Sequence, residues 1–216
     1  MSRPEEARVR AVLLDALGTL VELEPPWVHL AAALEAEPDE QLVRAVRAEM
    51  AYYKDHSHEG RDADSLAELR RSCAEILSRE LGLEISVETM MAAIRFHAFD
   101  DVAPALAELR GLGMTLVCAS NWDVSLPDVL ARCGLDGALD GVVTSAEVGA
   151  RKPDPAIFAA ALELAGCDPA EAIYVGDTPE EDLEGARAAG IRALLIDRGG
   201  GADIDSLHAI RNHLGL

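Results

Sequence analysis

Several side chains that could perform chemistry stand at, or just beyond, the ends of short apolar runs in the chain. These residues are Asp15, Ser120, Asn121, Lys152, Asp177 and Asp182. In an open parallel sheet, ligands bind outside the carboxyl ends of the strands, so side chains at those ends converge on one crevice. Carboxylates, a hydroxyl and a lysine gathered there would suit a divalent cation together with an anionic substrate.

Alternating strand and helix patterns from about residue 100 onward would position these side chains. Strands are expected over residues 12–15, 114–120, 141–145, 172–177 and 193–197. Helices are expected over residues 102–112, 126–133, 155–165, 179–189 and 206–214, the third opened by a capping Asp154 and closed by Gly166. Such alternation predicts a parallel sheet with right-handed crossovers, and hence a doubly wound, three-layer α/β sandwich.

Residues 22–98 break this alternation and favour a helical insert. Helical periodicity dominates over residues 30–34, 42–53, 66–81 and 87–99, without a strong strand pattern. We therefore expect a catalytic core of residues 1–21 plus 99–216 and a helical cap of residues 22–98. Hinges are expected at Pro25-Pro26 and at Asp100-Asp101. A cap at the edge of the crevice could act as a lid.

The ordered polar segments resemble those of the haloacid dehalogenase superfamily, in the branch with a helical cap after the first strand (subfamily IA-like). The resemblance covers nearly the whole chain. It rests on Asp15 with Gly18, Thr19 and Leu20, Ser120 with Asn121, Lys152 with Pro153, and Gly176 with Asp177 and Asp182. It implies a hydrolase with a Rossmann-like core that acts on a small molecule.

The resemblance also implies catalytic roles. Asp15 would be the nucleophile, because a carboxylate can attack phosphorus or carbon and form a covalent intermediate. Lys152 would neutralise Asp15 and the transferred group, and Ser120 would bind the anionic group. Thr19 and the backbone amides after Asp15 would cradle the oxyanion. Gly18 and Asn121 would complete substrate binding. The simpler interpretation of Gly18 and Thr19 is turn formation.

A magnesium site would use oxygens from the same segments. The resemblance assigns it to Asp15, the Leu17 backbone carbonyl and Asp177, with Asp182 supporting directly or through water. The simpler interpretation of Asp182 is an acid in the first turn of a helix, which the helix dipole favours. Glu180 and Glu181 are expected to be solvated acids of that turn.

Leu17 departs from the phosphatase pattern, which has an aspartate two positions after the nucleophile. That aspartate acts as general acid and base, and its loss typically costs roughly 10²–10⁴-fold in rate. Dehalogenases of the superfamily also lack it, because halide leaves unprotonated. They tend, however, to replace the acid that Asp177 represents. We therefore expect a magnesium-dependent phosphatase of a small metabolite, with a dehalogenase acting on carbon and a catalytically weak metabolite-binding protein as alternatives.

A polar and aromatic cluster in the insert could face the substrate. Its members are Tyr52, Tyr53, His56, His58 and Arg61. We expect Tyr53 and His56 to bind substrate, and one histidine could replace the missing proton donor. The simpler interpretation is a helix end followed by a solvated turn at Gly60.

Charge and composition exclude several partners. The 216 residues carry 39 acids and 19 lysines and arginines, a formal net charge of -20, which argues against nucleic acid and anionic membranes. Four scattered cysteines without a paired motif favour a reducing, cytoplasmic setting. Charged residues near the N-terminus argue against a signal peptide. The pattern leaves open whether the protein is a monomer or a homodimer.

Overall fold

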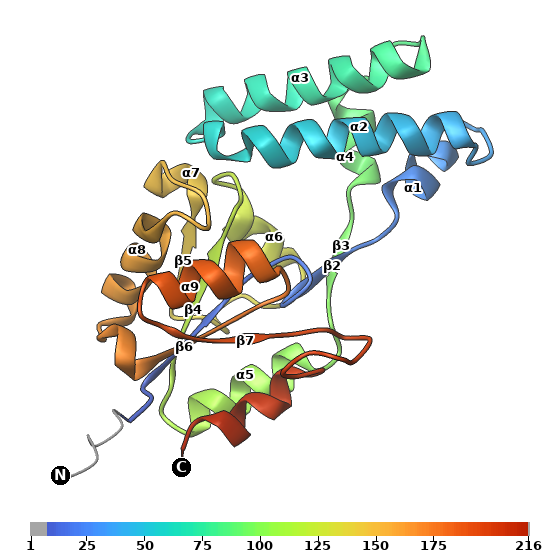
Figure 1. Cartoon of the computed structure of the whole chain (residues 1–216). Helices are drawn as coiled ribbons and strands as arrows, with labels where there is room; N and C mark the ends of the chain where they lie inside the picture. The colour runs from blue at the N-terminus through green and yellow to red at the C-terminus, as the bar shows by residue number, and fades with distance from the viewer. Residues whose placement is uncertain (1–7, 216) are drawn as a thin grey trace, which may run out of the picture.

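A five-stranded parallel sheet forms the body of the protein in the computed structural model, which describes residues 8–215 (Figure 1). Its strands lie in the order β5 (Gly141–Thr144), β4 (Thr115–Ser120), β1 (Ala11–Leu14), β6 (Ala172–Gly176) and β7 (Arg192–Leu195). The chain builds outward from β1 on one side and then on the other. The strand order thus reverses beside β1, where open α/β sheets bind ligands.

The register of β1 explains why polar side chains meet at its end. Leu14 pairs with Cys118 of β4 on one side and with Val175 of β6 on the other. All four residues of β1 are fully buried, as expected for a central parallel strand covered on both faces. Asp15 therefore emerges between the ends of two neighbouring strands, and its backbone N–H still bonds to the Val175 carbonyl.

Helices cover both faces of the sheet and make a three-layer sandwich. One face packs against α5 (Val102–Gly111), α6 (Leu126–Arg132) and η4 (Leu207–His213). The other packs against α8 (Pro155–Ala165) and α9 (Gly185–Ala188). Short elements α7 (Ser145–Val148) and η2 (Pro169–Glu171) complete the body. The predicted fold class is confirmed.

Local sequence signals correctly predicted where α8 begins and ends. The Asp154 side chain caps the first turn of α8, Pro155 occupies its first position, and Gly166 ends it in the left-handed conformation. Two other segments differ from the expected α-helices. Residues 207–213 form a 3₁₀ helix, and residues 179–184 form a π-helical turn, η3 (Pro179–Glu184), before α9. π-turns are common at functional sites, and η3 carries Asp182.

Four helices form the cap at one end of the molecule (Figure 1). They are α1 (Pro26–Ala33), α2 (Glu40–His56), α3 (Ala63–Leu81) and α4 (Val87–Ala93), with the short η1 (Ser57–Glu59) after α2. Their apolar faces share a core of their own, separate from the two cores of the sheet. A shallow groove of about 590 Å³ lies on this cap between Arg71 and Val87 and includes none of the predicted site residues.

Two strands that the sequence analysis missed connect the cap to the body. β2 (Val21–Leu23) and β3 (Phe96–Ala98) pair antiparallel, with Val21 opposite Ala98. Residues 22–98 showed no strong strand pattern, yet both short strands lie largely within them. The helix expected over residues 87–99 is wrong in its extent, because it ends at Ala93. Ile94 is already extended, so the chain leaves the helix before β3. Three-residue strands carry too little periodicity to be recognised locally.

Within residues 8–215, no helix is long and apolar enough to cross a membrane. The four cysteines are free. The charged segment before Arg8, which argued against a signal peptide, lies outside the described residues, as do residues 1–7 and 216 of the expected core.

Candidate active site

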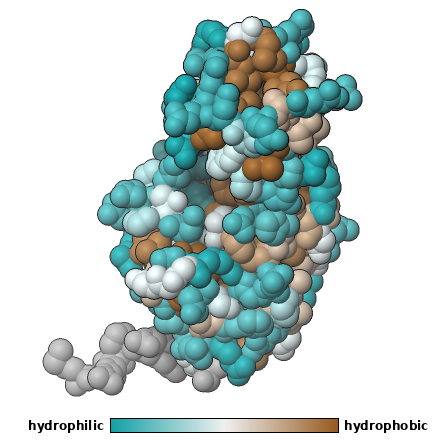
Figure 2. All heavy atoms as spheres, turned by 90° about the vertical axis from the view of Figure 1, so that its right-hand side faces the viewer, coloured by the Kyte–Doolittle hydropathy of each residue, from teal (hydrophilic) through white to brown (hydrophobic). Residues whose placement is uncertain are grey.

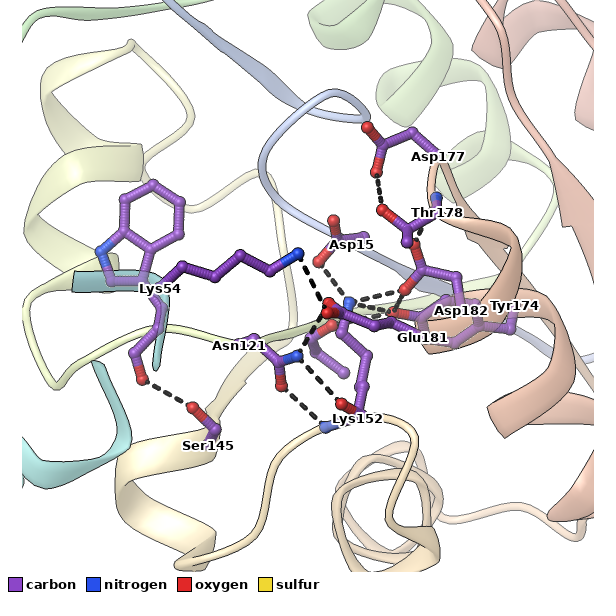
Figure 3. A network of polar contacts seen from close by, with 12 residues as sticks. Asp15, Lys54, Asn121, Ser145, Lys152, Tyr174, Asp177, Thr178, Glu181 and Asp182 are labelled. Carbon is purple, nitrogen blue, oxygen red and sulfur yellow. Dashed lines mark hydrogen bonds and ion pairs between the residues drawn. The ribbon is translucent and has the colours of Figure 1, made fainter. Parts of the chain in front are cut away.

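Five polar side chains meet beyond the ends of β1 and β6 (Figure 3). They are Asp15, Lys152, Tyr174, Asp177 and Asp182. Lys152 reaches this point from the loop between α7 and α8, and Asp182 from η3. The prediction that carboxylates and a lysine from distant segments converge is therefore confirmed in geometry.

Lys152 is buried and uses its whole hydrogen-bonding capacity. Its ammonium nitrogen lies 2.5 Å from Asp15 Oδ1, 2.6 Å from Asp182 Oδ1 and 2.9 Å from the Tyr174 hydroxyl. An ammonium group has three N–H donors, so all three are committed. Burial alone would lower the pKa of Lys152, but the charges of Asp15 and Asp182 raise it above its ordinary value. Lys152 is therefore a permanent cation.

Asp182 is held by the protein through both carboxylate oxygens. Oδ1 accepts from Lys152 and lies 3.0 Å from the Tyr174 hydroxyl, while Oδ2 accepts from the backbone N–H of Thr178 at 2.9 Å. The Tyr174 hydroxyl also lies 3.0 Å from the Ala119 carbonyl, which offers its proton a second acceptor. Asp182 thus positions the Lys152 ammonium. This role does not depend on whether Asp182 also contacts a metal.

Asp177 lies against the turn that follows Asp15. A Cβ atom built on Gly18 would stand 2.1 Å from Asp177 Oδ2, and Gly18 has a φ of +80°. Glycine is therefore required here both by conformation and by close approach. Single oxygens of Asp15, Asp177 and Asp182 lie within 4.8 Å of one another. This spacing is compatible with carboxylates around a single divalent cation.

The charges of this group do not balance. Three carboxylates and one ammonium leave two negative charges, in a region where Asp15 is buried. Burial raises the pKa of Asp15 to about 6, against the lowering effect of Lys152 and with a further increase from Asp182. Burial and the Asp182 charge also raise the pKa of Asp177. A bound cation would relieve this repulsion, so the residues fit a magnesium ion.

Oxygens that were expected to bind a metal belong to Asp15, Leu17 and Asp177. Asp15 and Asp177 offer carboxylate oxygens. The Leu17 carbonyl oxygen accepts no hydrogen bond from any donor within residues 8–215. Leu17 is 39% exposed, so an apolar group lies at the surface in the turn after Asp15.

Ser120, Asn121 and Thr19 differ in the hydrogen bonds that their side chains make. Ser120 is the buried last residue of β4. Thr19 is fully buried, and its hydroxyl has no partner among the described residues. The Asn121 amide accepts from the Lys152 N–H at 2.7 Å and donates to the Lys152 carbonyl at 3.2 Å. Asn121 therefore fixes the backbone of Lys152.

The cap residues expected to bind substrate have partners within the protein. The Tyr53 hydroxyl donates to Asp123 Oδ2 at 2.7 Å, and burial together with the Asp123 charge raises the Tyr53 pKa. His56 stacks on Tyr52, with ring centroids 3.9 Å apart, and its Nδ1 lies 2.8 Å from the Tyr52 carbonyl oxygen. Tyr53 thus ties the cap to the loop after β4.

Sequence reasoning missed three polar residues at the site. Tyr174 carries a hydroxyl group inside the otherwise apolar strand β6, and this could have marked it as a site residue. Glu181 was expected to be solvated, but its side chain is 24% exposed and contacts both Asn121 and Lys54. Lys54 gave no signal, because a lysine in the last turn of a helix is ordinarily a solvated charge that the dipole favours.

Comparison with known protein families shows the family to which the chain belongs. The sequence profile of the haloacid dehalogenase-like hydrolases matches residues 9–190. The chain belongs to this family. Both the resemblance and the assignment as a hydrolase are confirmed.

Similar proteins include phosphatases and a dehalogenase. A phosphoserine phosphatase from Thermus thermophilus is 40% identical over 109 residues, which span 49% of this chain and 43% of that protein. The structure of a phosphatase of this family from Thermococcus onnurineus superposes with a TM-score of 0.68 at 26% identity, covering 96% of this chain and 98% of the other. An L-2-haloacid dehalogenase from Xanthobacter autotrophicus gives 0.70 at 23% identity, covering 96% and 99%, which shows the shared fold alone. The chain spans about half the length of the curated relatives it matches.

Proposed function

We propose that this hydrolase is a magnesium-dependent phosphatase that acts on a small phosphorylated metabolite through an aspartyl-phosphate on Asp15. The observation that carries the proposal is the buried Lys152 ammonium bound to Asp15, with Asp177 against the same turn. The similarity to a phosphoserine phosphatase supports phosphoryl transfer over attack on carbon.

In the first step, Asp15 attacks the substrate phosphorus. Asp15 Oδ1 is held by Lys152, so Oδ2 is the oxygen left to form the new bond. The bond between phosphorus and the leaving oxygen breaks, and its electron pair stays on that oxygen. Lys152 keeps Asp15 oriented, while Ser120 and the Thr19 hydroxyl bind phosphoryl oxygens. Magnesium held by Asp15, Asp177 and the Leu17 carbonyl would supply charge neutralisation for the phosphoryl group.

In the second step, water attacks the phosphorus of the aspartyl-phosphate. The bond between phosphorus and Asp15 breaks, inorganic phosphate leaves as the dihydrogen anion with the water oxygen and both water protons, and the Asp15 carboxylate is restored. Asp15 must be ionised to attack, and its pKa of about 6 allows this at neutral pH even before a cation lowers it. Asp182 and Asn121 keep Lys152 in place through both steps.

Leu17 restricts the leaving groups that suit this site. The leucine side chain transfers no proton, so a leaving oxygen must depart as a stable anion or receive a proton from elsewhere. Acyl and aryl phosphates meet this condition better than alkyl phosphates. Leu17 is also the observation that favours the second candidate, a dehalogenase in which Asp15 attacks carbon, because halide needs no proton.

A substrate screen in water enriched in ¹⁸O tests the proposal against this second candidate. Phosphate esters, acyl phosphates and 2-haloacids would be supplied with and without magnesium. A phosphatase places ¹⁸O in inorganic phosphate and leaves the Asp15 carboxylate unlabelled. A dehalogenase hydrolyses its ester at the Asp15 carbonyl carbon and labels that carboxylate. Turnover of a 2-haloacid with labelled Asp15 would contradict the proposal, and absence of any turnover would favour the catalytically weak binding protein.

Residues 1–21 plus 99–216 would form the core and residues 22–98 the cap. Tyr53 and His56 would contribute to substrate recognition, in addition to the contacts described above. Four free cysteines are compatible with a cytoplasmic setting. The protein would be a monomer or a homodimer, and size-exclusion chromatography with light scattering would distinguish the two.

A further inference from the structure

Lys54 is a cap residue that reaches the core beside the candidate active site. It stands in the last turn of α2, and its ammonium nitrogen lies 3.1 Å from Glu181 Oε1. Figure 3 shows the Lys54 side chain extended toward Glu181, with Asp15 and Lys152 nearby. Figure 2 shows the surface hollowed between the cap and the body. Lys54 and Lys152 are the only two lysines of the chain, and both come to this one region.

Lys152 cannot neutralise a second anionic group of the substrate. Its three donors are bound to Asp15, Asp182 and Tyr174, and two carboxylates already offset its charge. A metal beside Asp15 and Asp177 would be engaged by the phosphoryl group. Any further anion on the substrate would meet a protein of net charge -20 and would need a cation placed locally.

Lys54 can supply that cation, because a substrate anion could displace Glu181, its present partner. The Lys54 side chain is 61% exposed, and ion pairs of this kind contribute little net stability. Neighbouring groups already have hydrogen-bond partners within the protein. Tyr53 is tied to Asp123 and His56 to Tyr52, while the core residue Arg151 donates to the Asp55 carbonyl.

Glu181 is the group that a second substrate anion would have to displace from Lys54. Its Oε1 faces Lys54, and its Oε2 accepts from the Asn121 amide at 3.0 Å. Asn121 in turn holds the backbone of Lys152. A substrate carboxylate could replace Glu181 on Lys54 while Glu181 stays bound to Asn121. A substrate without that group would leave the ion pair intact and gain nothing from Lys54.

From this arrangement we infer that Lys54 is a specificity-determining residue, and that the preferred substrates are small phosphates carrying a second anionic group such as a carboxylate. This inference rests on the proposed phosphatase function, because it presumes that the phosphoryl group occupies the site beside Asp15. Beyond that function, the inference names the class of substrate and assigns recognition of its second anionic group to the Lys54 side chain.

Two unreactive phosphonates test the inference without requiring turnover. Binding of 3-phosphonopropanoate and of propylphosphonate, which carries a methyl group in place of the carboxylate, would be measured by titration calorimetry with magnesium. Wild type should bind the carboxylate compound about tenfold more tightly, the order expected for a charge-assisted hydrogen bond. Lys54→Met should remove most of this preference, and Lys54→Arg should retain part of it.

Matched variants separate this role from a general charge effect. Arg44→Met removes an exposed cation from the same helix, where Arg44 pairs only with Glu40 among the described residues, and should keep the preference. Glu181→Gln frees Lys54 from its competitor and should strengthen the preference a few-fold. The role of Lys54 would be overturned if Lys54→Met kept the wild-type preference for the carboxylate compound. It would also be overturned if Arg44→Met lost as much of that preference as Lys54→Met. Neither result would contradict the proposed phosphatase function. Failure of wild type to bind either phosphonate would overturn the proposed phosphate site and this inference with it.

Discussion

The ammonium nitrogen of Lys152 lies 2.5 Å from Asp15 Oδ1, and both side chains are buried. Replacing Lys152 by Met would leave Asp15 and Asp182 without their shared cation. Breaking a buried ion pair on one side typically costs about 3–5 kcal/mol. We expect Lys152→Met to lose turnover and to lower the free energy of unfolding by that order in urea titrations without magnesium. Lys54→Met, which removes an exposed lysine, is the control and should unfold like wild type.

Gly18 allows a test of the metal site that removes no ligand. Gly18→Ala would force a Cβ against Asp177 Oδ2 and would also strain a positive φ. Magnesium affinity, measured by titration calorimetry, should fall at least about tenfold, because Asp177 must move away from Asp15. Gly113→Ala carries the same conformational strain, with a φ of +81° and nothing within 4 Å of the added atom. It should cost about 1–2 kcal/mol of stability and leave magnesium affinity unchanged.

Leu17 gives a prediction about leaving groups. Leu17→Asp would introduce a proton donor, so alkyl phosphate hydrolysis should rise more than aryl phosphate hydrolysis. The gain should be at most on the order of 10²-fold, since the new acid would not be optimally positioned. Steady-state rates at saturating magnesium for both substrate types check this. Efficient alkyl phosphate hydrolysis by wild type, together with no gain in the variant, would show that the leaving group does not need an acid at position 17.

Glu49 makes the stability of the cap depend on pH. It is buried in α2, and burial raises its pKa above the ordinary 4.5. The folded protein thus binds this proton more tightly than the unfolded chain. Its contribution to stability is therefore most favourable below pH 4.5 and declines as pH rises through the folded pKa. Glu49→Gln should raise the melting temperature at pH 7, and the gain should shrink toward pH 4. Glu75→Gln, at an exposed position of α3, should show neither effect.

The sequence predicted those parts of the molecule that depend on local pattern. Strand ends located Asp15 and Asp177, and a capping aspartate with a closing glycine located α8. What escaped prediction depends on contacts between distant segments. β2 and β3 exist because residues 21–23 pair with residues 96–98, and neither segment has a pattern of its own.

The same limit applies to the site. Lys54 and Glu181 resemble ordinary surface charges until the folded cap brings them within 3.1 Å of each other. Asn121 was expected to contact substrate, but the fold uses its amide to hold Lys152 and Glu181. Side-chain identity at a strand end predicts that a residue lies near the site. It does not predict whether that residue faces the substrate or supports a neighbour.

The central claim is that Asp15 carries the phosphoryl group during turnover. The most direct measurement is acid quenching during turnover of an acyl phosphate with magnesium, followed by peptide mass spectrometry. We expect a phosphoryl adduct on the peptide that contains Asp15, and neither adduct nor turnover in a folded Asp15→Asn variant. Turnover by wild type without an adduct at Asp15, or unchanged activity in Asp15→Asn, would contradict it.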